Sequence, residues 1–303
     1  MTNKTILITG SNGEIGQQLI NSLSKNISNQ IIALDLLPKK DSYKVYKYFE
    51  GSILDKNLVE KIFTKYDIKE VYHLAAVLST KAEKKPSLAH EINFEGTKII
   101  IDTVVKKNKI NKCLTKFFFP SSIAVYNVLG SKNKDKVKEN TLFKTPVTIY
   151  GKSKKLCEEY GLNKDGKFID FRCIRFPGII CATSIPTGGT SDYAPEMIHA
   201  AAQNNNYQCF VDSQAKLPFV IMPDAVDAII KIMQVNKSKL TNIAYNITSF
   251  NPTADDFYIE TKKHFKSFNI TYNVDYKRLN IVNSWPCDVD DSLAQQDWQW
   301  FPK

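Results

Sequence analysis

The segment "ILITGSNGEIGQQL" (6–19) is typical of a strand, a tight turn and a helix in direct succession. Gly10, Gly13 and Gly16 follow a short apolar run, and apolar residues then recur at helical spacing. Such a turn needs glycine's conformational freedom, and a phosphate group can approach the backbone closely only where no Cβ intrudes. The helix that follows offers unpaired N–H groups and the positive end of its dipole. The segment therefore predicts a diphosphate-binding loop that opens an α/β fold.

Strand-like and helix-like stretches alternate over the first 175 residues. The strand-like runs are KTILITG, NQIIALD, KVYKYFEG, KEVYHLAA, KFFFPSS and FIDFRCIRF. The helix-like stretches between them are EIGQQLINSLSKN, LVEKIFTKY, LAHEINFEGTKIIIDTVVKK and IYGKSKKLCEEYGL. This alternation is typical of a doubly wound parallel sheet. We therefore predict a Rossmann-type cofactor domain over residues 1–176 and a smaller substrate-binding lobe over 177–303, interleaved with late elements of the sheet.

The composition narrows the classes of function. No apolar run approaches the roughly 18 residues that span a bilayer, and the first predicted strand starts at Lys4, so we expect a cytoplasmic protein without a membrane segment or targeting peptide. The net charge is +10, but only three of the 41 basic residues are arginine and the lysines are scattered, so we expect no nucleic-acid partner. The six cysteines and four histidines lack metal-ligand spacing, so we expect no metal site.

An aspartate ends the second predicted strand, "NQIIALD". This residue, Asp35, lies 25 residues after Gly10. A carboxylate at this point can accept hydrogen bonds from both adenosine ribose hydroxyls and would repel a 2′-phosphate. The sequence therefore favours NAD over NADP as the cofactor.

A tyrosine and a lysine stand four residues apart at four places, Tyr43/Lys47, Tyr150/Lys154, Tyr160/Lys164 and Tyr258/Lys262. Among 14 tyrosines in a lysine-rich chain, the spacing alone decides nothing. Only Tyr150 opens a predicted amphipathic helix after a strand that ends in two serines, at the carboxyl end of the sheet where doubly wound folds bind ligands. The other pairs precede a strand, cross a helix end or lie outside the cofactor half. This context favours Tyr150 and Lys154 as a proton-handling pair.

These motifs resemble the extended subgroup of the short-chain dehydrogenase/reductase superfamily, in the G-x-x-G-x-x-G spacing and in "SSIAVY" (121–126). The resemblance implies that Ser122, Tyr150 and Lys154 are catalytic. Tyr150 would act as the base, Lys154 would favour its phenolate, and Ser122 would orient the substrate hydroxyl while hydride passes to NAD. A phenol, with an ordinary pKa near 10, needs such help at neutral pH.

The same resemblance implies a set of cofactor contacts. These are Gly10, Asn12, Gly13, Glu14, Ile15 and Gly16 in the glycine loop, Asp35, Ser52 and Ile53 beside the adenosine, Leu74, Ala75 and Ala76 at a strand end, Asn93 in the next helix, and Tyr150, Lys154, Pro177 and Ile180. Ser52 stands where an acidic residue commonly contacts adenine. His73 falls on a strand, and we interpret it as structural.

Motifs in the rest of the chain resemble a narrower family, the short-chain type of L-threonine 3-dehydrogenase. They are AAVLS (75–79), RFPGII (175–180), TGGTSDYA (187–194), LPFVIMPDAVDAI (217–229) and SWPCDVDDSLAQQDWQW (284–300). The resemblance implies oxidation of the L-threonine Cβ hydroxyl to 2-amino-3-ketobutyrate by a homodimer. It places Ser79, Ser122, Tyr150, Gly189, Thr190 and Trp285 around the substrate. Hydroxyl and backbone N–H groups of Ser79, Gly189 and Thr190 would receive it, and Trp285 would cap the pocket or else belong to the core.

Two alternatives stay open. A nucleotide-sugar epimerase or dehydratase uses the same Ser/Tyr/Lys arrangement, but it must hold a second diphosphate, usually through arginines in the late lobe. After Arg175 this chain has only Arg278. The other alternative is a non-enzymatic NAD-binding sensor, which would bind NADH and turn over nothing.

Overall fold

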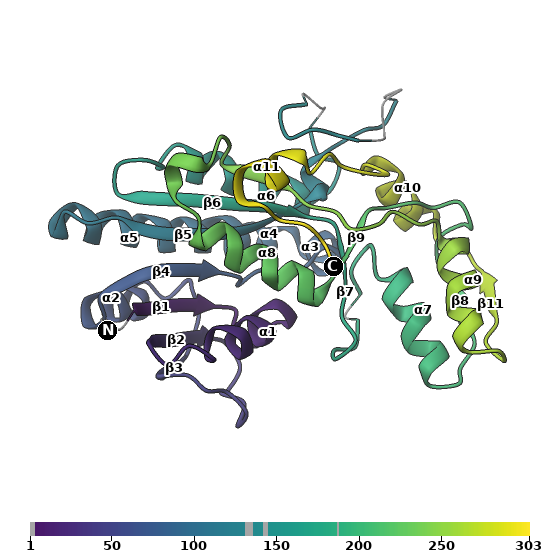
Figure 1. Ribbon diagram of the computed structural model, residues 1–303, viewed down its shortest axis with the longest axis horizontal. Helices are drawn as coiled ribbons and strands as arrows, with labels where there is room; N and C mark the ends of the chain where they lie inside the picture. The colour runs from purple at the N-terminus through teal and green to yellow at the C-terminus, as the bar shows by residue number, and fades with distance from the viewer. Residues whose placement is uncertain (1–3, 131–135, 142–144, 187) are drawn as a thin grey trace.

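A wholly parallel, seven-stranded sheet forms the centre of the fold, in the order β10-β6-β5-β4-β1-β2-β3 (Figure 1). The computed structural model describes residues 4–130, 136–141, 145–186 and 188–303. The strands are β1 (Lys4–Thr9), β2 (Asn29–Asp35), β3 (Lys47–Glu50), β4 (Ile68–His73), β5 (Thr115–Ser122), β6 (Ile169–Phe176) and β10 (Ala244–Asn246). The chain runs from β1 to one edge and then returns to β4 and the other edge. A ligand crevice is expected at this reversal, outside the carboxyl ends of β1 and β4.

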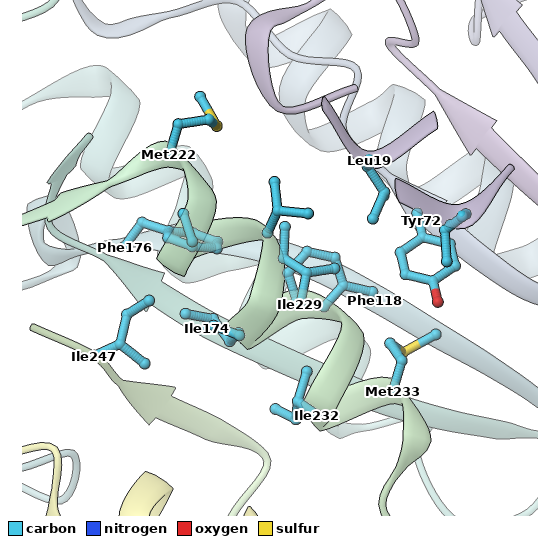
Figure 2. Packing of buried hydrophobic residues seen from close by; sticks show 14 of the residues in the cluster. Leu19, Tyr72, Phe118, Ile174, Phe176, Met222, Ile229, Ile232, Met233 and Ile247 are labelled. Carbon is cyan, nitrogen blue, oxygen red and sulfur yellow. The ribbon is translucent and has the colours of Figure 1, made fainter. Parts of the chain in front are cut away.

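Helices cover both faces of the sheet. On one face lie α1 (Glu14–Leu23), α8 (Met222–Gln234) and α11 (Ser292–Trp298), and on the other lie α2 (Lys56–Lys65), α5 (Thr97–Asn111) and α6 (Ile149–Leu162). Figure 2 shows Ile229 and Ile232 of α8 packed against Phe118 and Ile174 of the sheet. Both faces of the sheet are therefore buried, which explains why its strands read as continuous apolar runs.

A smaller lobe, to the right in Figure 1, follows β6. It contains β7 (Gly178–Ile180) paired with β9 (Phe219–Ile221), β8 (Tyr207–Cys209) paired with β11 (Ile270–Tyr272), and the helices α7 (Tyr193–Ala202), α9 (Ala254–His264) and α10 (Tyr276–Ser284). Its own core is rich in aromatic side chains, including Tyr193, Phe219, Phe257 and Trp285. The remaining elements are short. They are α3 (Ser79–Lys84), α4 (Pro86–His90), η1 (Glu91–Gly96), η2 (Ile123–Val125) and η3 (Lys237–Lys239).

The predicted fold class is confirmed. Late segments of the chain return to the sheet, because β10 pairs with β6 and α8 covers one face. The division at residue 176 stays a prediction. Among the described residues, no helix combines the length and the apolar character that crossing a membrane would require.

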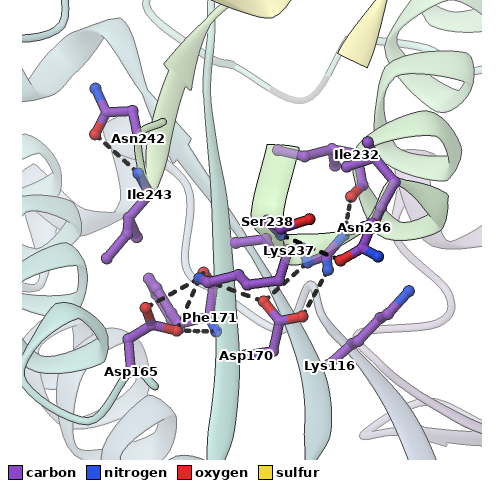
Figure 3. Close-up of polar contacts among 12 residues, drawn as sticks. Lys116, Asp165, Asp170, Phe171, Ile232, Asn236, Lys237, Ser238, Asn242 and Ile243 are labelled. Atoms are coloured by element: carbon purple, nitrogen blue, oxygen red, sulfur yellow. Dashed lines mark hydrogen bonds and ion pairs between the residues drawn. The ribbon is translucent and has the colours of Figure 1, made fainter. Parts of the chain in front are cut away.

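A buried ionic cluster fixes the end of α8 to the sheet (Figure 3). The Arg172 guanidinium, which is fully buried, pairs with Asp170 at 2.5 Å and donates to the carbonyl oxygens of Ile232 and Val235. Lys237 pairs with Asp165 at 2.9 Å beside them. Positive charge at a helix C-terminus is favourable because the last carbonyl groups have no partner within the helix.

Candidate active site

The glycine loop is shaped by two close backbone approaches. Gly10 has a φ of +69°, and a Cβ there would lie 2.5 Å from the nitrogen of Ala75. A Cβ on Gly16 would lie 2.6 Å from the carbonyl oxygen of Gly10. At Gly13 a Cβ would meet only that same oxygen, at 3.2 Å, on the side of the loop where α1 begins. The loop therefore forms a cradle at a helix N-terminus that suits a diphosphate.

A cavity of about 380 Å³ adjoins this cradle at the end of β2. Its lining includes Gly10, Gly13, Asp35, Ser52, Ile53, Leu74, Ala75 and Ala76. The Asp35 carboxylate accepts the N–H groups of Asn12 and Leu37 at 2.8 and 3.0 Å. The Asn12 side chain in turn donates to the carbonyl oxygens of Leu37 and Pro38. The residues predicted around adenosine thus lie together, and the chemistry of this cavity fits an adenosine with a free ribose diol.

A second cavity, of about 320 Å³, continues from the first across the carboxyl end of the sheet. The two share Gly10, Gly13, Leu74, Ala76 and Leu78. The lining of the second cavity includes Glu14, Ile15, Gly16, Ser79, Ser122, Tyr150, Lys154, Pro177, Gly189, Thr190 and Trp285. The structure therefore brings the predicted catalytic and substrate residues, and most of the predicted cofactor residues, to one cleft formed by the two cavities. Within the described residues, His, Cys, Asp and Glu side chains form no group of three that could hold a metal ion.

Helix α6 places Tyr150 and Lys154 on the same side. Thr148 caps the helix by accepting the N–H of Gly151 at 2.9 Å. The Lys154 ammonium lies 5.5 Å from the centroid of the Tyr150 ring and donates to the carbonyl oxygen of Pro120 at 2.6 Å. Lys154 is 4 % exposed, so its charge acts on the tyrosine with little solvent screening.

The serine at the end of β5 completes this group. Ser122 Oγ accepts the N–H of Ala124 at 3.1 Å, which leaves its own O–H to donate. The helix can lie this close because Gly151 has no side chain; a Cβ there would collide with the carbonyl oxygen of Ala124. A substrate oxygen in the cleft can therefore meet two hydroxyl groups, from Ser122 and Tyr150.

The tyrosines of the other three pairs line neither cavity, and their hydroxyl groups are hydrogen-bonded to other residues. Tyr43 donates to the carbonyl oxygen of Ser11 at 2.8 Å, and Tyr160 donates to Asp102 at 2.6 Å. Tyr258 accepts from Lys262 at 2.8 Å within α9. Of the four tyrosine–lysine pairs, only Tyr150/Lys154 lines the reaction cavity.

The predicted substrate loop differs from expectation in its hydrogen bonds. The Asp192 carboxylate accepts the N–H groups of Gly188 and Gly189 at 2.9 and 2.5 Å, so the Gly189 N–H is not directed to a ligand. Ser79 Oγ accepts from both Thr190 N and Thr190 Oγ1 at 3.3 Å. The Ser79 O–H is therefore the donor that this part of the cleft offers, and the Thr190 N–H serves to orient it. Thr187, the first residue of the predicted motif, lies outside the described residues.

Trp285 combines the two roles considered for it. Its side chain is 5 % exposed and belongs to the core of the smaller lobe, and its ring also lines the reaction cavity. Its indole N–H is buried and has no partner among the described residues. Trp285 is thus a core residue with one edge on the cleft.

Three predicted cofactor residues, Asn12, Asn93 and Ile180, line neither cavity. Asn12 instead donates its backbone N–H to Asp35. Ile180 packs into the core of the smaller lobe, while Ile179 lines the reaction cavity. Successive strand side chains point to opposite faces, so a shift of one residue exchanges the two, and alternation along β7 was the available signal. Asn93 is buried, and its amide exchanges hydrogen bonds with the Val77 backbone at 2.7 and 3.0 Å. It holds the loop after β4 in place.

His73 is buried in a directed chain of hydrogen bonds. Thr97 Oγ1 donates to the carbonyl oxygen of Asn93 at 2.6 Å, so it must accept from His73 Nε2 at 2.9 Å. His73 Nδ1 then accepts from Thr9 Oγ1 at 2.7 Å, which assigns a neutral imidazole with its proton on Nε2. Burial, with a smaller contribution from the Lys154 ammonium, lowers the pKa of His73 to about 3. Our interpretation of His73 as structural agrees with this geometry.

We expect His73 to make stability depend on pH. The unfolded imidazole takes up a proton near pH 6.5, whereas the folded one does so only near its lowered pKa of about 3, so protons favour unfolding between these values. From pH 7.5 to pH 5 the free energy of unfolding should fall by about 2 kcal/mol because of this group. His73→Gln, which keeps a neutral donor and acceptor, should lose correspondingly less. Urea unfolding of both proteins at pH 7.5 and pH 5 measures this; equal losses would contradict it.

A third cavity, of about 630 Å³, lies between α6 and β10 and contacts none of the predicted site residues. Among its charged groups, Arg175 pairs with Glu158 at 2.7 Å and Lys237 pairs with Asp165 at 2.9 Å. Size alone does not make it a site, because these four charged groups are already paired with one another. The cleft at the carboxyl end of the sheet is the stronger candidate.

Comparison with known proteins places the chain in a family. The model of the NAD dependent epimerase/dehydratase family matches residues 6–248. The chain belongs to this family. Its cofactor is accordingly NAD, as predicted, and it is an NAD-dependent enzyme.

Several relatives of this family member match over nearly its whole length. It is 32% identical over 300 residues to a Bos taurus protein named L-threonine 3-dehydrogenase, mitochondrial, covering 97% of this chain and 78% of that one. A structure titled monomeric L-threonine 3-dehydrogenase, from a metagenome, is 36% identical with a TM-score of 0.89, covering 98% and 94% of the two chains. An L-threonine dehydrogenase structure from Clostridium difficile is 32% identical with a TM-score of 0.90, covering 100% and 94%.

Proposed function

We propose that this protein oxidises the Cβ hydroxyl of L-threonine to 2-amino-3-ketobutyrate with NAD. The observation that carries the proposal is the lining of one cleft by two sets of residues, Ser122, Tyr150 and Lys154 on one side and Ser79, Thr190 and Trp285 on the other. The names of the full-length relatives support the same substrate.

Each catalytic residue has a separate role in the reaction at the substrate Cβ. When bound, NAD supplies the acceptor for the hydride that leaves Cβ. Tyr150 takes the hydroxyl proton, while the adjacent Lys154 ammonium stabilises negative charge on the phenolic oxygen. Ser122 donates its free O–H to the same substrate oxygen and fixes its position. The O–H of Ser79 and the indole N–H of Trp285 are donors available to the carboxylate end of the amino acid.

The charge of the cleft argues against the nucleotide-sugar alternative. The charged residues that line the reaction cavity are Glu14, Lys154 and Asp192, and no arginine is among the described lining residues. Arg172 and Arg175 are paired within the sheet, and Arg278 bonds a loop carbonyl. A second diphosphate would therefore find two carboxylates and one lysine where it needs several cations.

The direct test is NADH formation at 340 nm with L-threonine, compared with UDP-glucose. We expect turnover with threonine alone, and a higher melting temperature with NADH and threonine than with NADH and the UDP-sugar. A folded protein that binds NADH and turns over neither compound would favour the sensor alternative. A melting shift with the UDP-sugar alone would favour the epimerase alternative.

Asp35 should determine the preference for NAD over NADP. Its carboxylate lines the adenosine cavity and is oriented by the Asn12 and Leu37 amides, where it would repel a 2′-phosphate. We expect Asp35→Ser to raise the ratio of kcat/KM with NADP to that with NAD at least about tenfold, since removing one charge repulsion is worth more than about 1.4 kcal/mol. Steady-state kinetics with both cofactors measures the ratio, with Asp41→Ser as a control in the following exposed loop. An unchanged ratio would contradict this role.

The homodimer implied by the resemblance belongs to the same proposal. The outward faces of α5 and α6 expose Leu156 and Leu162 together with charged groups such as Asp102 and Lys106. One structural relative is titled monomeric. Light scattering at several protein concentrations distinguishes the two states. The cytoplasmic location stays a prediction.

A further inference from the structure

Helix α10 contacts two parts of the substrate side of the cleft. It begins after Asp275, whose carboxylate accepts the N–H groups of Lys277 and Arg278. It ends at Ser284, and the ring of the next residue, Trp285, lines the reaction cavity. From the first turn, the Arg278 guanidinium reaches the loop at 188–192 and donates from Nη2 to the carbonyl oxygen of Gly189 at 2.7 Å. One helix thus carries a wall of the cleft and an anchor for the neighbouring loop.

The Arg278 side chain is held closely by its surroundings. Its guanidinium carbon lies 3.0 Å from the centroid of the Phe210 ring, a cation–π contact. Its Nε is buried and has no partner among the described residues. Burial lowers the pKa of Arg278, and the carboxylates of Glu196 and Asp192 partly offset this. Burying an arginine with one unpaired N–H donor costs folding free energy. Stability alone therefore does not explain why Arg278 lies here and binds Gly189.

The Gly189–Thr190 peptide supplies that reason. In a trans peptide the carbonyl and the following N–H point in opposite directions. Because Arg278 holds the Gly189 carbonyl on one side, the Thr190 N–H points the other way, to Ser79 Oγ at 3.3 Å. Ser79 Oγ also accepts from Thr190 Oγ1, so its own proton is left for the cleft that it lines.

We propose that Arg278 is a positioning residue for the substrate: by fixing the Gly189–Thr190 peptide, it orients the Ser79 hydroxyl that receives the carboxylate end of the amino acid. This inference rests on the proposed function for the identity of the substrate. The positioning itself concerns only the protein. Because Ser79 would contact the carboxylate equally before and during hydride transfer, the effect falls on KM and not on kcat.

The test compares Arg278→Met with Lys277→Met, which removes the same charge from the adjacent exposed position of the same helix. We expect Arg278→Met to raise KM for L-threonine at least about tenfold, with kcat changed less than about threefold and the NADH dissociation constant within about twofold. Lys277→Met should match the wild type in all three. Arg278→Lys should recover part of the loss, and added guanidinium ion at millimolar concentration should lower KM in Arg278→Ala only.

A second measurement separates this inference from the proposed function. Amide hydrogen exchange of segment 188–194 in the NADH-bound protein should be at least about tenfold faster in Arg278→Met than in Lys277→Met, whatever the substrate proves to be. Equal exchange in the two variants would overturn the positioning role, as would an unchanged KM for a threonine-active enzyme. Faster exchange in a protein that does not oxidise threonine would overturn the substrate assignment and keep the positioning role.

Discussion

Tyr150→Phe is expected to lower kcat for threonine oxidation about 10²- to 10⁴-fold, the range that a positioned acid–base group contributes. The substitution removes one oxygen from a side chain that lines the reaction cavity, beside the Lys154 ammonium. The ring itself stays, so the packing of α6 against Val77 and Ala89 should be kept. The loss should therefore appear in kcat, while the NADH dissociation constant stays within about threefold.

The chain offers a matched control for this prediction. Tyr258 and Lys262 have the same spacing on α9, and their side chains are hydrogen-bonded at 2.8 Å. Tyr258→Phe removes the same oxygen from an equivalent pair outside the cleft, and we expect wild-type kcat. NADH fluorescence titration and stopped-flow hydride transfer measure binding and chemistry separately. A Tyr150→Phe enzyme with kcat within about threefold of wild type would rule out Tyr150 as the proton acceptor.

The sequence was most informative where one local requirement determines one residue type. Gly10 must be glycine because its φ is +69° and Ala75 lies against it, so the loop could be recognised from its spacing. The buried strands could be predicted because the sheet is covered on both faces and its residues are almost all apolar. The helix from Ile149 to Leu162 followed from periodicity and was predicted with the bounds that the structure has.

The sequence was least informative where a side chain's partner lies far along the chain. Asn93 was assigned to the cofactor, but its amide is hydrogen-bonded to the Val77 backbone, a pairing that depends on how η1 lies beside the loop after β4. Arg278 was weighed only as a phosphate ligand, although it contacts a carbonyl 89 residues away. Such contacts follow from tertiary packing, and local patterns carry no signal for them.

Arg172→Met is expected to destabilise the fold by about 3–5 kcal/mol, the usual cost of removing one partner from a buried ion pair. Arg172 is fully buried and Asp170 is 3 % exposed, so the substitution leaves a carboxylate inside the protein. Lys237 lies 3.4 Å from Asp170 but is partly exposed, and it cannot replace the bidentate pair. The carbonyl groups of Ile232 and Val235 at the end of α8 also lose their donor. Equilibrium urea unfolding at pH 7.5 measures the loss.

The double variant Arg172→Met/Asp170→Leu separates two costs of the single substitution: the unpaired Asp170 carboxylate and the unpaired carbonyl groups of α8. If the cost of the single substitution is mainly the unpaired carboxylate, removing that carboxylate should recover at least about half of the lost stability. Equal stability of the single and double variants would instead assign the cost to the α8 carbonyl groups. Arg172 lines neither cavity of the cleft, so kcat/KM of the folded fraction should stay within about twofold of wild type in both variants. A larger loss of activity would contradict the purely structural role of the cluster, because a shift of α8 would then change the geometry of the cleft.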